Sequence, residues 1–109
     1  MNNKTIMLVC NAGMSTSLLA AKIQAAAKEE GANIDIFATS AADADNSLNN
    51  RKVDVLLLGP QVRFMLKQFE KKLQPKGIPV AVINMADYGM MNGKKVLAQA
   101  ESLIAGKKE

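Results

Sequence analysis

Residues 8–19, LVCNAGMSTSLL, lead from an apolar segment through the only cysteine of the chain into small and hydroxyl-bearing residues, and then into a leucine pair. The apolar segment at 5–10, TIMLVC, is rich in β-branched and long aliphatic residues, as in a buried strand. Serine and threonine, which fill positions 15–17, are preferred at helix starts. The stretch therefore predicts a strand, a short loop with Cys10 at its mouth, and a helix.

The same alternation of strand and helix patterns continues to the end of the chain. Three further apolar segments of strand type lie at residues 33–38, 53–58 and 79–84. Apolar residues spaced by three and four predict helices between and after these segments. They are Leu19, Ile23, Ala26 and Ala27 in the first helix, Leu48 in a short second one, Val62, Met65, Leu66, Phe69 and Leu73 in the third, and Val96, Leu97, Ala100, Leu103 and Ile104 in the last.

Local signals mark the ends of two of these helices. Gly31 supplies the left-handed residue that would close the first helix, in which Leu18 and Leu19 are expected to face the core. Ser40 and Asp43 have the spacing of a capping box at the start of the second helix.

The order of elements predicts the architecture of the chain. Strands that alternate with helices form parallel sheets with right-handed crossovers and helices on both faces. We therefore expect a single domain over residues 1–109, an α/β three-layer sandwich with a four-stranded parallel sheet in the order 2-1-3-4. In that order, ligands bind outside the carboxyl ends of strands 1 and 3. Cys10 lies at one of these ends, Gly59, Pro60 and Gln61 lie at the other, and residues 84–92 follow strand 4 beside them.

Composition excludes several classes of protein. The chain has 109 residues, is 49% hydrophobic, and has one cysteine and no histidine, so neither an internal disulfide nor a zinc site is expected. The net charge of +4 would suit a nucleic-acid partner, but the chain has only three Phe, one Tyr and no Trp on which bases could stack. No nucleic-acid partner is therefore expected. No apolar run approaches the roughly 18 residues of a membrane span, and no signal peptide is evident. These features predict a cytoplasmic chain without a metal site.

The loop after Cys10 has the features of a phosphate-binding loop (P-loop). Small residues allow successive backbone N–H groups to point inward as an anion nest, and the helix start adds unpaired donors and a positive dipole end. The same donors stabilise a thiolate, which makes Cys10 a candidate nucleophile. The expected phosphate-binding residues are Asn11, Ala12, Gly13, Met14, Ser15, Thr16 and Ser17.

Alternatives remain open on residue chemistry alone. Cys10 would also suit a small buried core residue, with the hydroxyl residues serving only as a helix cap. A low-molecular-weight phosphatase-like phosphate-binding protein has a similar layout, but its signature has an arginine where this chain has Thr16. The nucleotide-binding signature G-x-x-x-x-G-K-[ST] is absent. A carrier that holds a phosphoryl group without hydrolysing it is the interpretation that fits the missing arginine.

Three motifs resemble one known family. The runs VCNAGMSTSLL, LLGPQV and INMADYGMMNGKKVL are similar, in this order, to the lactose/cellobiose-type IIB components of the bacterial phosphoenolpyruvate-dependent sugar phosphotransferase system (PTS). The resemblance implies that Cys10 accepts a phosphoryl group from a phosphohistidine of a IIA partner. It also implies transfer to a sugar, such as cellobiose or a related β-linked disaccharide, during uptake through a separate membrane component, IIC. The chain would then be a cytoplasmic phosphotransferase without a metal or nucleotide cofactor, associated peripherally with IIC.

Several side chains near this loop are candidates for partner contact. Methionine adapts to different surfaces, which suits a protein that must bind two partners in turn. Tyr88 could reach the phosphate or brace its loop, and Gln61 could bind the loop backbone or a partner. Met90 and Met91 could instead start the last helix and turn inward. The predicted contact residues are Met14, Pro60, Gln61, Met85 and Tyr88.

Overall fold

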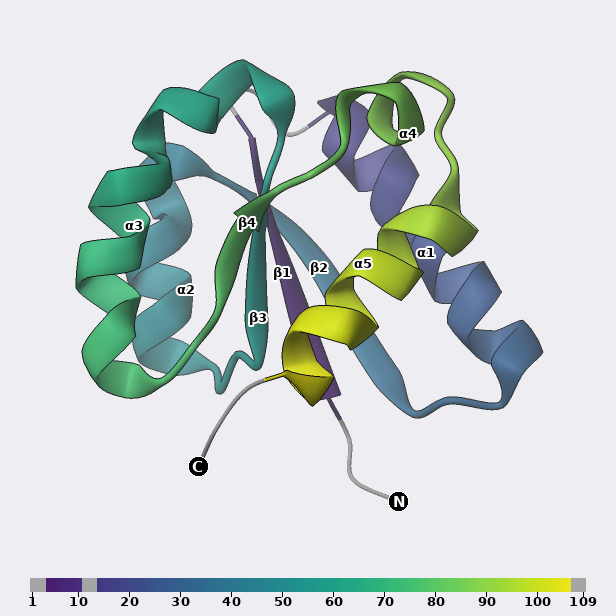
Figure 1. The fold of residues 1–109 in the computed structure, drawn as a ribbon, viewed down its shortest axis with the longest axis horizontal. Coiled ribbons are helices and arrows are strands. Elements are labelled where there is room, and N and C mark those ends of the chain that lie inside the picture. Colours follow the sequence, from purple (N-terminus) through teal and green to yellow (C-terminus); the bar gives the residue numbers. More distant parts are fainter. Residues whose placement is uncertain (1–3, 11–13, 107–109) are drawn as a thin grey trace.

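Four parallel strands form one sheet in the order β2-β1-β3-β4 (Figure 1). The computed structural model describes residues 4–10 and 14–106. The predicted α/β class, strand order and parallel pairing are confirmed, although each strand boundary differs slightly from the expected one. The strands are β1 Lys4–Cys10, β2 Ile34–Ser40, β3 Val55–Leu58 and β4 Val80–Val82.

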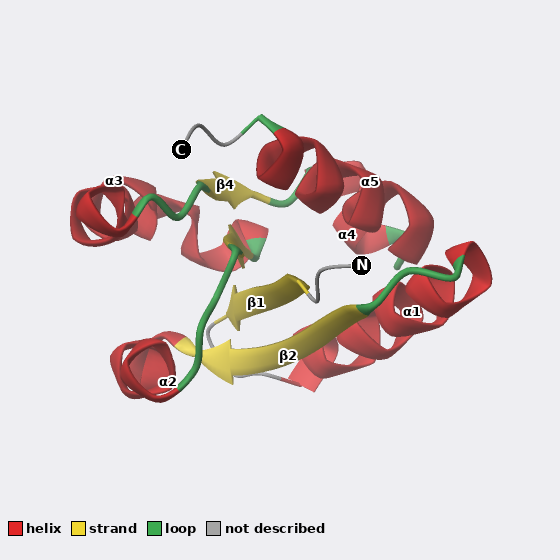
Figure 2. Ribbon diagram, turned by 90° about the horizontal axis from the view of Figure 1, so that it is seen from below, coloured by secondary structure: helices red, strands yellow, loops and turns green. Residues whose placement is uncertain are grey.

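Helices cover both faces of the sheet, as predicted for a three-layer sandwich (Figure 2). The α-helices are α1 Met14–Glu30, α2 Ala44–Asn50, α3 Leu66–Leu73, α4 Met85–Gly89 and α5 Gly93–Ala105. Short 3-10 helices are η1 Ala41–Asp43, η2 Pro60–Met65 and η3 Gln74–Lys76. Within the described ranges, no helix has the length and apolar character needed to cross a bilayer.

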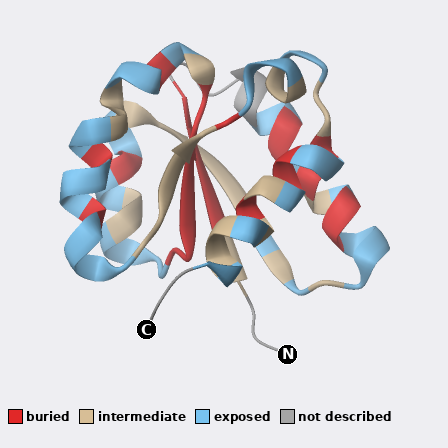
Figure 3. Ribbon diagram, in the orientation of Figure 1, coloured by how far each residue is buried: buried red, intermediate tan, exposed pale blue. Residues whose placement is uncertain are grey.

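The core is divided between the two faces of the sheet. Ile6 and Leu8 of β1 pack with α1 and α5, whereas Met7 and Val9 pack toward α2 and α3. This division follows from the alternation of side chains along a strand. The central strands β1 and β3 are consequently buried for most of their length, and most of the exposed residues lie on the outer helices and the connecting loops (Figure 3).

The first helix begins earlier than the sequence pattern predicts. It starts at Met14, so residues 14–17 form its first turn rather than loop. Leu19 is buried as expected, but Leu18 is 54% exposed, which corrects the prediction that both leucines face the core. Adjacent helical residues are separated by about 100° around the helix axis, so only one of the two can point directly at the sheet.

The connections after β3 and β4 also differ from expectation. Val62, predicted as the first residue of the third helical stripe, has φ −117° and ψ 24° within η2, and the α-helix starts only at Leu66. After β4, the expected irregular connection contains the additional helix α4. Asn84 caps this helix, with its Oδ1 accepting from the backbone N–H of Asp87 at 3.1 Å. At only five residues, α4 is too short to show helical periodicity in the sequence.

The two predicted helix-end signals are present in the structure. Gly31 adopts φ +72°, the left-handed conformation that ends α1. The Ser40 hydroxyl oxygen accepts from the backbone N–H of Asp43 at 3.3 Å, but this cap belongs to η1, which precedes α2. The capping spacing therefore predicted the interaction correctly and the type of helix incorrectly.

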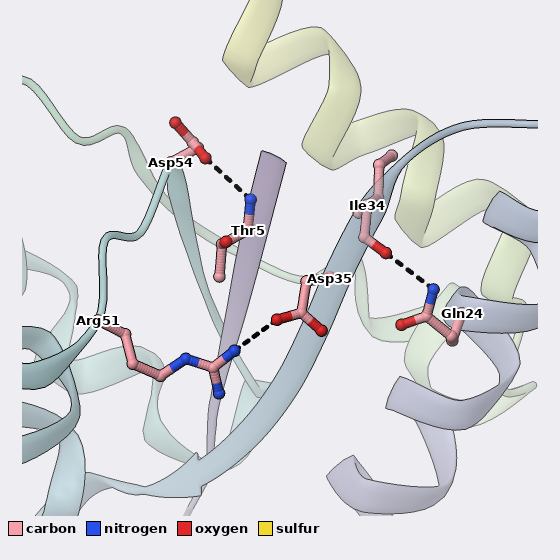
Figure 4. Close-up of polar contacts among 6 residues, drawn as sticks. All are labelled: Thr5, Gln24, Ile34, Asp35, Arg51 and Asp54. Carbon is pink, nitrogen blue, oxygen red and sulfur yellow. Dashed lines mark hydrogen bonds and ion pairs between the residues drawn. The ribbon is translucent and has the colours of Figure 1, made fainter. Parts of the chain in front are cut away.

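Polar contacts join the elements toward the amino-terminal edge of the sheet (Figure 4). The carboxylate of buried Asp54 accepts from the backbone N–H of Thr5 at 2.8 Å, and the Asp54 N–H donates to the Thr5 carbonyl at 2.9 Å. Gln24 of α1 donates from Nε2 to the Ile34 carbonyl at 2.8 Å. These contacts hold β1 against the start of β3 and α1 against β2.

Two carboxyl groups, Glu30 of α1 and Glu101 of α5, meet where these helices pack together. Burial raises the pKa of Glu101 above its ordinary value of 4.5, and a hydrogen bond with Glu30 and the negative charge of Glu30 raise it further. A raised pKa means that folding favours the protonated form of Glu101. The resulting stabilisation is fully present below pH 4.5 and is lost as the pH rises through the raised pKa.

Replacing this carboxyl group should therefore stabilise the protein at neutral pH. We expect Glu101→Gln to raise the free energy of unfolding at pH 7 by about 0.5 kcal/mol, the size of a repulsion between partly exposed like charges. The gain should disappear in acid, and urea denaturation across pH 4 to 7 measures it. Glu70→Gln, at an exposed position of α3, is the control. A gain for Glu101→Gln that is the same at every pH would contradict the repulsion.

Candidate functional site

Cys10 is the last residue of β1 and lies at the carboxyl-terminal edge of the sheet. Cys10 pairs with Ser40 of β2 and is only 1% exposed. Because side chains alternate along a strand, Cys10 is on the same face as Ile6 and Leu8, the face covered by α1 and α5. The thiol is therefore enclosed at the edge of the sheet where α1 begins.

The amino-terminal turn of α1 follows Cys10 closely in the chain, starting at Met14. The first backbone N–H groups of an α-helix have no intrahelical acceptor, and its dipole is positive at this end. Such a helix start favours an anion, either a thiolate or a phosphoryl group. Burial of Cys10 is compatible with both interpretations of the sequence, because a side chain at the end of a buried strand is sheltered from water whether it is a core residue or a nucleophile.

The structure describes the predicted phosphate-binding loop only in part. Asn11, Ala12 and Gly13 lie outside the described residues, as do the side chains of residues 14–16. The backbone of 14–17 forms the first turn of α1, and Ser17 is exposed there. Their assignment to phosphate binding stays a prediction.

The turn after β3 comes directly against the end of β1. The Gly59 N–H donates to the Val9 carbonyl at 2.8 Å, so the residue before Cys10 is bonded to this turn. A Cβ atom at Gly59 would collide with the Oε1 atom of Gln61, which shows that the Gln61 side chain folds back over Gly59. Pro60 starts η2 at a position where its missing N–H is not needed.

A side-chain hydrogen bond joins the turn after β3 to the helix after β4. Gln61 Nε2 donates to the Tyr88 hydroxyl at 2.6 Å, across 27 positions in the sequence. The sequence pattern placed both residues beside the loop but did not predict this contact. Both alternatives for Tyr88, contact with the phosphate and bracing of its loop, stay predictions. The roles of both residues in partner contact stay predictions.

Large apolar side chains are exposed on the elements of this edge. Phe64 in η2 is 79% exposed, and Met85 and Met90 of the α4 region are 61% and 78% exposed. Met90 therefore does not turn inward, whereas Met91 adopts φ +53° and packs partly against the core. The last helix starts beyond both methionines, at Gly93. Pro60 is half-buried, and Met85 is available for the predicted partner contact.

Phe64 was missed as a candidate, although the sequence contains the signal for it. The apolar stripe of the third helical segment runs through Val62, Met65, Leu66 and Phe69, and Phe64 falls outside this stripe. An aromatic residue off the core-facing stripe of an amphipathic segment is expected to be exposed. Its neighbour Arg63 is also exposed, and among the described residues Arg63 has no ion-pair partner.

Comparison with known proteins assigns the chain to a family. Residues 5–99 match the family described as PTS system, Lactose/Cellobiose specific IIB subunit. The chain belongs to this family. It is therefore a IIB phosphotransferase component of a sugar-specific PTS, as the resemblance of its motifs predicted.

Curated relatives of this IIB chain carry the names of different sugars. A galactose-specific EIIB component from Lactococcus lactis is 56% identical over 107 residues, covering 95% of this chain and 99% of its own. A cellobiose-specific EIIB component from the same species is 55% identical over the same length and coverage. An oligo-beta-mannoside-specific EIIB component from Bacillus subtilis is 41% identical over 101 residues, covering 93% and 96%. Overall identity therefore does not separate the sugars in these names.

Solved structures of IIB proteins have the same fold. The solution structure of a cellobiose-specific IIB component from Borrelia burgdorferi superposes with a TM-score of 0.79 at 42% identity, covering 99% of this chain and 97% of that one. A lactose-specific IIB domain from Streptococcus pneumoniae superposes with a TM-score of 0.83 at 15% identity, covering 94% and 98%. The second likeness concerns the fold alone.

Proposed function

We propose that this IIB chain carries a phosphoryl group on Cys10, which it accepts from a phosphohistidine of a IIA partner and transfers to a sugar entering through membrane component IIC. The observation that supports this role is the position of Cys10 at the end of β1, where the amino-terminal turn of α1 begins. That turn favours an anion in both states of the carrier. The chain would act at the cytoplasmic face of the membrane, associated with IIC.

The two transfers balance as nucleophilic displacements at phosphorus. In the first, the thiolate of Cys10 attacks, an S–P bond forms, and the N–P bond of the donor histidine breaks. In the second, a sugar hydroxyl oxygen attacks, an O–P bond forms, the S–P bond breaks, and the hydroxyl proton passes to a base. The thiolate is thereby regenerated. A cysteine anion is both the nucleophile and the leaving group, which suits a carrier that must accept and release the same group.

Retention of the phosphoryl group against water is part of the proposal. Thr16 stands where the phosphatase signature has arginine. A guanidinium in that place would stabilise the charge of the hydrolytic transition state through a bidentate contact. Without it, the phosphocysteine should persist long enough to meet IIC.

The sugar that we propose is a β-linked disaccharide such as cellobiose. The support comes from relatives whose names specify cellobiose and oligo-beta-mannoside. Membrane vesicles that contain the cognate IIC test this assignment. Phosphorylation of cellobiose should depend on this chain, and a preference for galactose in the same vesicles would overturn the choice of sugar.

The carrier role is tested by phosphotransfer followed by mapping of the modified residue. The chain is incubated with phosphoenolpyruvate, the general PTS proteins and IIA, and its intact mass is recorded under mild conditions that preserve a thiophosphate ester. We expect one phosphoryl group, located on Cys10. With an aryl phosphate and no partners, the chain should release no phosphate steadily. Steady release would instead support the phosphatase-like alternative.

Partner docking is proposed for the apolar side chains around this edge. Met14, Pro60, Gln61, Met85 and Tyr88 are the contacts predicted from the sequence. Met85 and Phe64, both exposed, are the docking anchors that we propose, whereas Gln61 and Tyr88 are hydrogen-bonded to each other. Exposed aromatic and methionine side chains are enriched at protein interfaces. Arg63 and Lys67 lie beside Phe64, both are exposed, and neither has an ion-pair partner among the described residues. A partner with an apolar centre and an acidic rim would complement this surface.

Removal of Phe64 should weaken docking without slowing transfer. We expect Phe64→Ala to raise the half-saturating concentration of IIB in phosphotransfer from IIA by about tenfold, because a large exposed aromatic anchor is lost. The maximal rate should change less than about twofold, since Phe64 is not placed to act on the reacting atoms. Rapid-quench measurements with IIB varied and phospho-IIA limiting give both quantities. Lys76→Ala, at an exposed position of η3, is the control. An unchanged half-saturating concentration for Phe64→Ala would exclude this surface as the docking site of IIA.

A further inference from the structure

The Gln61–Tyr88 hydrogen bond joins two segments that both lie at the edge of the sheet where Cys10 is found. Gln61 lies in η2, which follows β3, and Tyr88 lies in α4, which follows β4. Figure 1 shows η2 and α4 at the same edge of the sheet, above the carboxyl ends of their strands. At 2.6 Å this is a short contact for an N–H donor and a hydroxyl oxygen.

Gln61 is in turn connected, through Gly59, to the strand that carries Cys10. The Gln61 side chain folds back so closely over Gly59 that a Cβ there would collide with its Oε1 atom. Gly59 in turn donates from its N–H to the Val9 carbonyl at 2.8 Å. A continuous set of contacts thus leads from the end of β1, through Gly59 and Gln61, to Tyr88.

On the side of Tyr88, the hydrogen bond from Gln61 connects to a short helix. The α4 helix has five residues, and Tyr88 packs partly against the core beneath it. The Met91 N–H donates to the Tyr88 carbonyl at 3.1 Å and connects α4 to the approach to α5. The hydrogen bond from Gln61 joins α4 to η2, so it relates Met85 on one element to Phe64 on the other.

We infer that Gln61 and Tyr88 are positioning residues for phosphoryl transfer, which hold η2 and α4 in a fixed relation to Cys10. This inference rests on the proposed function. A donor that docks on Phe64 and Met85 reaches in-line geometry at the sulfur only if these two anchors keep their places. Displacements of about 1 Å are enough to slow such reactions strongly. Without the Gln61–Tyr88 hydrogen bond, a donor still docks, but fewer of its bound orientations are productive.

The test separates positioning from docking and from folding. Tyr88→Phe removes the hydroxyl and keeps the ring, and Gln61→Ala removes the amide. In rapid-quench transfer from phospho-IIA, each variant should lower the maximal rate by about tenfold and leave the half-saturating concentration within about twofold of the original. The double variant should again be about tenfold slower rather than a hundredfold, because both changes break one contact. Gln74→Ala, at an exposed glutamine near the other end of α3, is the matched control.

Several outcomes would overturn the inference. Single variants with the original maximal rate exclude a positioning role, and effects that multiply in the double variant show that the residues act independently. A change confined to the half-saturating concentration assigns them to docking instead. A fall in melting temperature that accounts for the lost rate assigns them to folding. In all these cases Cys10 would still become labelled, so failure of the inference is distinguishable from failure of the proposed carrier role.

Discussion

A Cys10→Ser chain should accept no phosphoryl group from IIA, a loss of more than about a thousandfold in transfer rate. The replacement exchanges sulfur for oxygen at the end of β1 and leaves the start of α1 in place. A serine hydroxyl is a much weaker nucleophile than the sulfur of a cysteine, whose thiolate is the reactive form in such transfers. Alkoxide is also a poor leaving group, so a phosphoserine formed by slow side reaction would not pass its phosphoryl group to a sugar.

The measurement is intact mass after incubation with phosphoenolpyruvate, the general PTS proteins and IIA. Cys10 is 1% exposed, so a more polar hydroxyl in its place should lower stability by about 1–2 kcal/mol, and circular dichroism must show that the variant is folded. Ser102→Ala, at an exposed position of α5, should be labelled like the original chain. Labelling of Cys10→Ser at the original rate, or a label on another residue, would remove Cys10 from the mechanism.

The second large effect is expected at Gly93, the first residue of α5. A Cβ atom there would lie 2.6 Å from the Lys22 carbonyl oxygen and 3.0 Å from the Ile23 nitrogen, both backbone atoms of α1. These atoms cannot move without displacing a helix, so Gly93→Ala must push α5 away from α1. Overpacking of this kind costs about 1–3 kcal/mol, and the better helix propensity of alanine recovers less than about 1 kcal/mol.

We therefore expect Gly93→Ala to lower the free energy of unfolding by about 2 kcal/mol and the melting temperature by roughly 10 °C. Urea denaturation and thermal melts measure the two quantities. Gly89→Ala is the matched control, because a Cβ at Gly89 meets nothing within 4 Å. It should leave stability unchanged or slightly raised. Equal stabilities for the two alanine variants would show that the close approach of α1 and α5 relaxes freely.

Both predictions involve α1, which begins after Cys10 and packs against Gly93. The start of α1 provides the donors that favour an anion near Cys10, and its middle turns pack on α5 through Leu19, Ile23 and Ala26. The amino-terminal turn of α1, which we propose binds the phosphoryl group, is therefore positioned by a hydrophobic contact along the length of the helix. A change at Gly93, remote in sequence from Cys10, should consequently affect transfer as well as stability.

The parallel sheet and the place of Cys10 could be predicted because their signals are local. Apolar runs of period two and stripes of period three to four are contained within single segments, and their alternation restricts the topology to very few arrangements. The order β2-β1-β3-β4 then puts the carboxyl ends of β1 and β3 side by side. Cys10, Gly59 and Gln61 could be assigned to one edge on this basis.

The alternation of elements, the sheet order and the edge at which the cysteine lies could thus be inferred from the order of residues. The folded chain was needed to show that Gln61 bonds Tyr88, that Phe64 is exposed, that α4 is helical, and that Gly93 lies against the backbone of Lys22. Periodicity records which side of a segment is apolar, whereas contacts between segments depend on the angles and distances at which helices pack on the sheet. Those angles result from the packing of all the core side chains together.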